Sequence, residues 1–498
     1  MTDAEEAAVV DWFEGRSEKK IETGCAWVFL AGDTAFKVKK RVDLGFLDYS
    51  TLDLRLWALE RELRFNRAAS SDIYRAVRQV TRAAGGGLEL DGAGEVVEYA
   101  LEMRRFDESF VLSARPWAVD GRLAEALGRL VAKTHAGADI RPEGGGGKAL
   151  KYTIDSNAKL LRELAPRLGH ERVEAVIAAT DMEYFKREPL LDQRRTAGFA
   201  RHCHADLHLG NILLEDDRPI LFDCIEFNDV LSEIDVQYDI AFLLMDLDFR
   251  RRRDAGVRVL SSYLDEALRH FEPAVLEGLA ALPLMLAVRA GVRAHVWAHT
   301  GDDAAAGAYL DAALDHLSPP PPKLVAVGGL SGSGKSTFAR LIAPGLGASP
   351  GAVVLRTDEI RKRLMGVPPE ASLPATVYSP SFYAEVYETL ISETRTLLAA
   401  GRAVVLDATF IQPDLRARVE EAAIGAGVPF HGVWLEAAPE VLAARIEGRE
   451  GDASDATVAT LRMQLERDVG PIGWVRVDAS GPAQDSAEAW SARYAQPE

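Results

Sequence analysis

The stretch Gly329-Leu330-Ser331-Gly332-Ser333-Gly334-Lys335-Ser336 decides the fold of the C-terminal part of the chain. Residues 324–327 directly before it are apolar and predict a buried strand, and the apolar spacing over 338–342 behind it predicts a helix. A glycine-rich loop between a strand and a helix N-terminus presents backbone N–H groups to phosphate. The stretch therefore predicts a strand–loop–helix unit with a phosphate site at its centre.

This sequence is a complete Walker A motif, which predicts an ATP·Mg²⁺ site. Lys335 would neutralise the β/γ-phosphate region, and the Ser336 hydroxyl would reach Mg²⁺. The residues expected to bind nucleotide are Gly329, Ser331, Gly332, Ser333, Gly334, Lys335, Ser336 and Thr337.

Two further apolar segments place carboxylates after predicted strands. Residues 353–355 precede Asp358 and Arg361, and residues 404–406 end in Asp407. The order of strand, loop, helix and strand predicts an α/β fold with a doubly wound parallel sheet. An alternative for Asp358 is a helix N-cap, with Arg361 in solvent.

At these residues the chain resembles small P-loop kinases. Asp358 and Arg361 resemble the D-x-x-R pattern of polynucleotide kinases, which implies that Asp358 activates an acceptor hydroxyl and Arg361 binds acceptor phosphate. Asp407 resembles a Walker B-type carboxylate that orients a Mg²⁺ water. Arg445 and Arg449 share a helix face and resemble the lid arginines of gluconate kinase and zeta-toxin-like proteins. A solvated basic face is the alternative for this pair.

Four consecutive prolines at 319–322 mark the clearest boundary, because proline can neither continue a helix nor enter a central strand. We expect domains at 1–318 and 324–498, joined by a stiff linker at 319–323 that keeps them close but separate. Four glycines at 144–147 predict a mobile loop inside the first domain.

A second motif, His204-Ala205-Asp206-Leu207-His208-Leu209-Gly210-Asn211, is followed twelve residues later by Asp223. Phosphoryl transfer needs a group that orients and deprotonates the attacking hydroxyl, together with oxygen ligands that hold Mg²⁺ against ATP. One Asp, an Asn five residues on and an Asp after a further strand supply these three functions. The motif predicts a second, separate phosphotransfer site.

These residues resemble the H-x-D-x-H-x-x-N loop of the aminoglycoside phosphotransferase family, which has a bilobal protein-kinase-like fold. The resemblance implies Asp206 as catalytic base and Asn211 with Asp223 as Mg²⁺ ligands. It also implies a strand lysine paired with a helix glutamate for ATP. Lys37 and Lys39 both fit the lysine, and Glu62, with Glu60 as a weaker rival, fits the glutamate; these alternatives stay open.

Two features around this motif qualify the resemblance. Residues 238–241 are similar to the family's Y-D-L-A segment, which implies a structural role for Asp239. The chain has no G-x-G-x-x-G loop for the phosphates, and residues 21–26 contain a single glycine, Gly24.

The order of elements in the N-terminal part is that of a kinase, with a small β-rich lobe before a helical one. Strands are predicted at 25–30 and 34–38, and a helix begins near Leu52 with Ser50 and Asp53 at capping-box spacing. Helices dominate 121–318, with a β-rich island at 212–227. The fold class is therefore mixed α/β and α+β.

Charge and composition restrict the partners. The formal net charge is −18, so we expect small-molecule acceptors and no nucleic-acid polymer. Three cysteines make no disulfide or zinc pattern. The acidic N-terminus lacks signal-peptide features, and the apolar run at 279–288 is short and predicts a core helix. These observations favour a cytoplasmic protein without membrane partners.

The leading hypothesis is a bifunctional ATP-dependent kinase. The first domain would phosphorylate a hydroxyl of a sugar, aminocyclitol or related metabolite, and the second would phosphorylate another small acceptor, with or without a phosphate of its own. One alternative is a single active kinase with a regulatory nucleotide-binding P-loop domain. The other is a toxin-like P-loop kinase restrained by the first domain.

Overall fold

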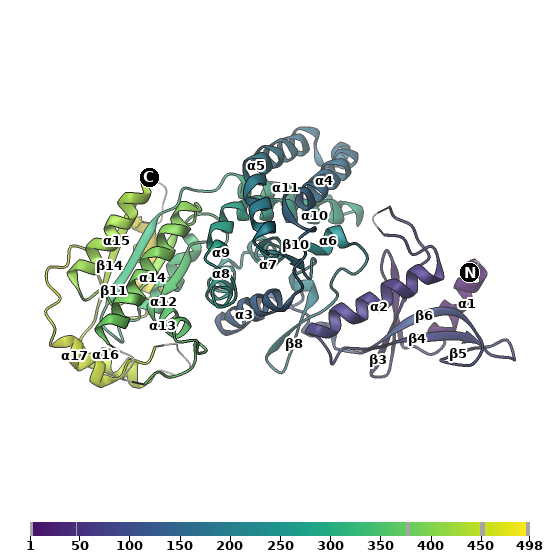
Figure 1. Ribbon diagram of the computed structural model, residues 1–498, viewed down its shortest axis with the longest axis horizontal. Coiled ribbons are helices and arrows are strands. Elements are labelled where there is room, and N and C mark those ends of the chain that lie inside the picture. Colours follow the sequence, from purple (N-terminus) through teal and green to yellow (C-terminus); the bar gives the residue numbers. More distant parts are fainter. Residues whose placement is uncertain (1–2, 46, 375–378, 449–453, 495–498) are drawn as a thin grey trace. The chain divides into compact units, whose positions relative to one another are not determined.

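The structure is a computed structural model that describes residues 3–45, 47–374, 379–448 and 454–494. The chain forms two compact units (Figure 1). The first unit comprises residues 1–118, 139–145 and 198–239, and the second comprises 119–138, 146–197 and 240–498. Both units are built from separate pieces of the chain, and each is described on its own.

An antiparallel sheet of six strands dominates the first unit, in the order β1-β2-β3-β6-β4-β5. Its strands are β1 (Lys19–Glu22), β2 (Ala26–Ala31), β3 (Thr34–Lys39), β4 (Tyr74–Arg82), β5 (Leu88–Leu90) and β6 (Glu95–Arg104). The strands predicted at 25–30 and 34–38 are β2 and β3. Helix α1 (Asp3–Glu14) buries Val9 and Phe13 in a hydrophobic cluster with Phe29 and Val38 of these strands.

Helix α2 (Leu52–Ala69) carries the candidate glutamate of the first site. The prediction that Ser50 caps it was wrong. Thr51 is the N-cap, with extended backbone, and its side chain accepts a hydrogen bond from the Leu54 amide. Ser50 instead donates its own amide to Asp48 Oδ1, so it belongs to the preceding turn.

Residues 200–235 of the first unit form short strand pairs that are connected by loops. The predicted β-rich island is the hairpin of β8 (Ile212–Glu215) and β9 (Arg218–Leu221). A second pair joins β7 (Ala200–His202) to β10 (Glu233–Asp235), and the short helix α6 (Asp229–Ser232) directly precedes β10 in the chain. Leu213 of β8 packs with Leu59 of α2 and Leu101 of β6, which ties the loop to the six-stranded sheet.

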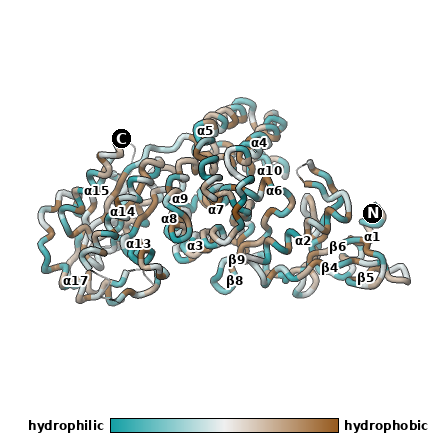
Figure 2. Tube along the Cα trace, in the orientation of Figure 1, coloured by the Kyte–Doolittle hydropathy of each residue, from teal (hydrophilic) through white to brown (hydrophobic). Residues whose placement is uncertain are grey.

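Helices make up much of the second unit. They are α3 (Gly121–Gly137), α4 (Gly146–Leu168), α5 (His170–Thr196), α7 (Val236–Phe249, which crosses the unit boundary), α8 (Arg253–Ala267), α9 (Ala274–Glu277), α10 (Leu282–His299) and α11 (Asp303–Leu317). Figure 2 shows α7 as mostly hydrophobic, and its residues 240–245 are buried. Residues 274–299 are long and apolar enough to cross a membrane by length and composition, but 78% of this stretch's most apolar window is buried in the protein.

The prediction of a mobile loop over the whole glycine run at 144–147 was wrong. Helix α4 begins at Gly146, and both Gly146 and Gly147 are buried. Gly146 has φ +67, a conformation that favours glycine. The Gly147 amide donates to Asp192 Oδ1 of α5 at 3.0 Å, and a Cβ there would lie 2.9 Å from Glu188. Close packing of α4 on α5 therefore explains these glycines.

The C-terminal part of the second unit contains the predicted parallel sheet, in the order β12-β13-β11-β14-β15. Its strands are β11 (Leu324–Gly329), β12 (Val353–Arg356), β13 (Val404–Asp407), β14 (Phe430–Glu436) and β15 (Val475–Asp478). The helices are α12 (Lys335–Ile342), α13 (Thr357–Leu364), α14 (Pro380–Ala399), α15 (Pro413–Ala426), α16 (Pro439–Glu447), α17 (Val458–Leu465) and α18 (Ala483–Tyr494). Helices cover both faces of the sheet, as in a doubly wound fold (Figure 1).

Helix α8 packs directly against this sheet region, so the segments before and after the prolines are in close contact within the second unit. Val257 of α8 is buried in the same hydrophobic cluster as Val325 and Phe338. The Val354 amide at the edge strand β12 donates to Ser261 Oγ of α8 at 3.0 Å. An edge strand has unpaired backbone groups, and α8 satisfies one of them.

Candidate active sites

The first candidate site centres on a buried cluster of two lysines and three carboxylates. Lys37 Nζ lies 2.6 Å from Glu62 Oε1 and 2.8 Å from Asp223 Oδ1. Lys39 Nζ lies 2.6 Å from both Glu62 Oε2 and Glu226 Oε1. Both lysines point to the same face of β3 because side chains two residues apart in a strand do so. Glu62 of α2 bridges them.

The surroundings of the two lysines differ. The Lys37 side chain is 13% exposed and reaches Asp223, which is 47% exposed. The Lys39 side chain is 2% exposed, and its second partner Glu226 also accepts a hydrogen bond from the Tyr49 hydroxyl. This geometry favours Lys37 for nucleotide and Lys39 for holding Glu62 in place. Glu60, the rival of Glu62, is exposed.

Electrostatics keep this cluster charged. Burial raises the pKa of Glu62, but the ammonium groups of Lys37 and Lys39 more than reverse this and lower it to about 2. Burial alone would lower the pKa of Lys37; Asp223 and Glu62 raise it well above its ordinary value. Burial also raises the pKa of Glu226, which Lys39 opposes. Sequence reasoning missed Glu226; its only signal was a carboxylate three residues after Asp223.

The loop that holds Asp206 is fixed by its own hydrogen bonds. Asn211 Nδ2 donates to the Asp206 carbonyl at 2.9 Å and to Asp206 Oδ2 at 2.8 Å. His208 Nε2 lies 3.5 Å from Asp206 Oδ2. Asp239 accepts the amides of His204 and Ala205, and Ala205 has φ +69, so the carboxylate stabilises a strained turn. Asp239 thus has the structural position that the resemblance implied.

Asp223 lies after β9 with φ +60, and its amide donates to the Tyr74 hydroxyl at 3.0 Å. Its carboxylate stays beside Lys37 at the exposed side of the cluster. Asn211 uses its Nδ2 for Asp206, which leaves the amide oxygen as the atom that could bind a metal. A carboxylate and an amide oxygen fit Mg²⁺, which prefers oxygen ligands.

The second candidate site is a cavity of about 1330 Å³ in the second unit, lined by Ser331–Phe338 of the glycine-rich loop and α12. Gly332 has φ +83, and a Cβ there would lie 2.4 Å from the Leu442 carbonyl oxygen. Lys335 Nζ donates to the Leu330 carbonyl at 2.9 Å across the loop. The predicted residues from Ser331 to Thr337 thus lie together around one cavity, whereas Gly329 is buried at the end of β11 and does not line it.

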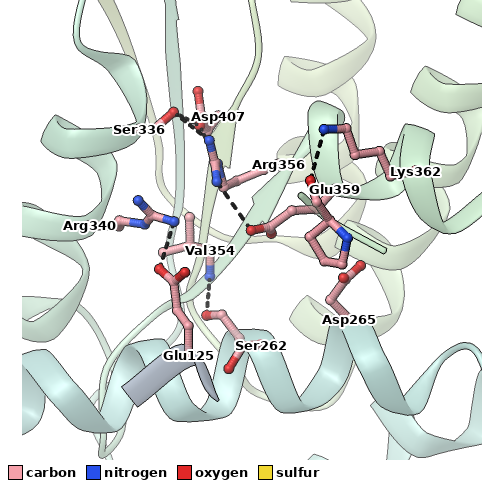
Figure 3. A network of polar contacts seen from close by, with 12 residues as sticks. Glu125, Ser262, Asp265, Ser336, Arg340, Val354, Arg356, Glu359, Lys362 and Asp407 are labelled. Carbon is pink, nitrogen blue, oxygen red and sulfur yellow. Dashed lines mark hydrogen bonds and ion pairs between the residues drawn. The ribbon is translucent and has the colours of Figure 1, made fainter. Parts of the chain in front are cut away.

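The predicted Mg²⁺ ligands of this site meet where the first turn of α12 lies beside the end of β13. Ser336 Oγ donates to Asp407 Oδ2 at 2.6 Å. Arg356, which sequence reasoning missed, lies against both: its Nε is 3.0 Å from Asp407 Oδ2 and its Nη2 is 3.0 Å from Ser336 Oγ. Its Nη1 also pairs with Glu359 at 3.2 Å (Figure 3). The hydroxyl oxygen of Ser336 and the carboxylate oxygens of Asp407 fit Mg²⁺. The Arg356 guanidinium bound to both shows that these oxygens attract a positive group.

Other predicted residues of the second site lie in different surroundings. Asp358 and Arg361 line the same cavity and pair with one another. Arg445 also lines it, but its guanidinium donates to the carbonyls of Ala479, Ser480 and Gly481, so its action on a transferring phosphoryl stays a prediction. Arg449 lies outside the described residues.

Comparisons with known proteins match a family model to each of two regions of the chain. The phosphotransferase enzyme family matches residues 80–279, and the AAA domain family matches residues 324–469. An uncharacterized protein of Mycobacterium tuberculosis is 32% identical over 489 residues, which cover 93% of each chain, and one of Mycobacterium bovis matches equally well.

Similar solved structures cover about a third of the chain each. They include a sugar kinase from Janibacter sp. (20% identity, 34% of this chain and 94% of that chain, TM-score 0.26) and a gluconokinase from Sinorhizobium meliloti (27%, 35% and 94%, TM-score 0.24). An APS kinase of Mycobacterium tuberculosis is 22% identical (34% and 96%, TM-score 0.26). The chain belongs to one family with the full-length mycobacterial proteins, and it is an ATP-dependent kinase with a phosphotransferase-family domain followed by a P-loop kinase domain.

Proposed function

We propose that the chain is a bifunctional phosphotransferase with two separate ATP·Mg²⁺ sites. The first site phosphorylates a hydroxyl of a small polar molecule such as a sugar or aminocyclitol. The second phosphorylates another small acceptor. The observation that carries this proposal is that each unit has its own phosphate-handling set: Lys37 with Glu62 and Asp223 in the first, and Lys335 with Ser336 and Asp407 in the second.

In the first site, Lys37 would hold the phosphates of ATP while Glu62 keeps the ammonium in place. Asp206 would accept the proton of the acceptor hydroxyl, and Asn211 fixes the Asp206 carboxylate by a hydrogen bond. Asn211 and Asp223 would hold Mg²⁺, which supplies charge neutralisation for the phosphates when bound.

In the second site, the backbone amides of the glycine-rich loop and Lys335 would bind the phosphates. Ser336 and Asp407 would hold Mg²⁺ directly or through water. Asp358 would accept the acceptor proton, since it lines the same cavity as the loop. Arg361 would orient the acceptor beside it.

Calorimetry of the full chain with the ATP analogue AMPPNP and Mg²⁺ tests the number of sites. We expect two equivalents per chain, one lost in Lys335→Ala and the other weakened in Asp223→Ala. Lys323→Ala, at the linker, is the matched control and should keep both. A single equivalent in the wild-type chain would reject two sites.

Transfer must be tested apart from binding, because a regulatory P-loop domain would also bind ATP. An ATP-consumption screen of sugars, aminocyclitols and nucleosides can use the full chain in Asp206→Asn and Asp358→Asn backgrounds, each of which silences one site. Acceptor-dependent turnover in both backgrounds supports two kinases. Turnover that survives only in Asp358→Asn would favour a regulatory second domain.

A further inference from the structure

The cavity of the second site is not built by the parallel-sheet region alone. Part of its wall comes from helices α3 and α8. Both precede the proline linker and lie within residues 80–279, which match the phosphotransferase enzyme family. The wall residues from this part of the second unit are Asp120, Gly121, Arg122, Glu125, Arg129 and Arg258.

Glu125 of α3 is the centre of a group of arginines in this wall. Its carboxylate lies 2.7 Å from Arg340 Nη2 of α12 and 3.1 Å from Arg258 Nη1 of α8 (Figure 3 draws the Arg340 contact). Arg129, one turn further along α3, lies 3.8 Å from it. One carboxylate cannot neutralise three guanidinium groups, so the group carries surplus positive charge.

The compensation from other residues is incomplete. Glu370 lies 3.5 Å from Arg129 and balances that one charge in part. Arg122, at the start of α3, is exposed and has no hydrogen-bond or ion-pair partner within the described parts of the chain. Counting the carboxylates of Asp120, Glu125 and Glu370 against the guanidinium groups of Arg122, Arg129, Arg258 and Arg340 leaves one positive charge. The arginine wall, by which we mean Arg122, Arg129 and Arg258, therefore presents net positive charge to the cavity.

This wall is displaced from the place where ATP phosphates would bind. Phosphate binds at the N-terminus of α12, where Lys335 begins the helix. Arg340 lies five residues further, about 7.5 Å along the axis, and contacts Glu125 there. A cavity of about 1330 Å³ exceeds what one drug-sized ligand fills, roughly 300–1,000 Å³. The space and the charge both suit a second, anionic molecule beside the nucleotide.

We propose that the arginine wall of α3 and α8 is the acceptor subsite of the P-loop kinase and binds an anionic group, phosphate or carboxylate, of a small acceptor. The helical part that precedes the linker thus completes the second active site. This inference rests on the proposed function of the second site, because it assumes that Asp358 faces an acceptor. The acceptor's charged group contacts the wall while its hydroxyl lies toward Asp358.

Binding of simple anions to the full chain tests the subsite without a known acceptor. The chain, saturated with AMPPNP and Mg²⁺, is titrated with inorganic phosphate and with acetate, which separate the two anion chemistries. We expect one of them to bind at least 10-fold more weakly in the double variant Arg122→Ala/Arg129→Ala. Lys133→Ala, an exposed cation on the same helix outside the cavity, should bind like wild type.

A purely structural role of these arginines predicts another pattern. Arg122→Ala alone should leave the denaturation midpoint unchanged, because Arg122 has no partner among the described residues, and should still weaken anion binding. Equal anion affinity in wild type and the double variant, with AMPPNP binding intact, overturns the subsite and leaves the kinase proposal standing. If the wild-type chain bound no AMPPNP equivalent that depends on Lys335, the proposed function itself would be overturned instead.

Discussion

Replacement of Glu62 by Gln tests whether the buried negative charge of Glu62 stabilises the lysine cluster. Glu62 is fully buried between Lys37 and Lys39, with both ammonium nitrogens at 2.6 Å. Gln has the same shape, so the variant removes the charge and little else. Lys37 would then keep only the half-exposed carboxylate of Asp223 as a partner, and Lys39 only that of Glu226.

The expected loss follows from the pKa of Glu62, which folding lowers from 4.5 to about 2. Each pKa unit corresponds to 1.36 kcal/mol, so the cluster stabilises the ionised Glu62 by about 3 kcal/mol. Breaking a buried ion pair by removing one partner costs about 3–5 kcal/mol in other proteins. We therefore expect Glu62→Gln to destabilise the first unit by about 3 kcal/mol and to weaken its ATP binding.

Native-state hydrogen exchange is the suitable assay, because it reports the opening of one region in a protein of several parts. Amides of β3 and α2 should lose about 10²-fold protection in Glu62→Gln, which is the same free energy. Glu60→Gln, exposed on the same helix, should change protection less than about 2-fold. Similar protection in the two variants would show that Glu62 does not hold the lysine pair.

The pH dependence gives a second check with a defined sign. The pKa of Glu62 is lower in the folded chain, so its stabilising effect is fully present above pH 4.5 and is lost as the pH falls toward 2. The difference in protection between wild type and Glu62→Gln should narrow through this window. A constant difference from pH 6 to pH 3 would contradict the assigned cause.

Three further predictions concern catalysis and packing. Asp206→Asn should keep ATP binding and reduce turnover of the first site by roughly 10²–10⁴; steady-state kinetics with near-wild-type transfer would remove Asp206 from the mechanism. Arg361→Ala should mainly raise the acceptor KM of the second site, because binding present in both ground and transition states is lost; an effect confined to kcat would contradict this. Val257→Ala should lower the protection of β12 amides by about 2 kcal/mol, whereas Val296→Ala, at an exposed position of α10, should not.

Local sequence patterns predicted both folds and most candidate site residues, because these depend on short segments. The Walker A stretch specifies its own loop through glycine conformations and one lysine, and residues 204–211 close on themselves through hydrogen bonds such as that from Asn211 to Asp206. Apolar runs marked β11, β12 and β13 because strands buried on both faces are apolar throughout.

Tertiary structure decided what depends on contacts between distant segments. Lys37 and Lys39 are equivalent in sequence, and only the positions of Asp223 and Glu226, more than 180 residues away, separate them. Arg356 has no motif of its own and becomes relevant because β12 and β13 lie side by side. The proline run suggested two separate bodies, but a linker's sequence carries no information about which surfaces will pack. The burial of Val257 against the P-loop sheet, and the arginines of α3 and α8 in its cavity, arise from that packing alone.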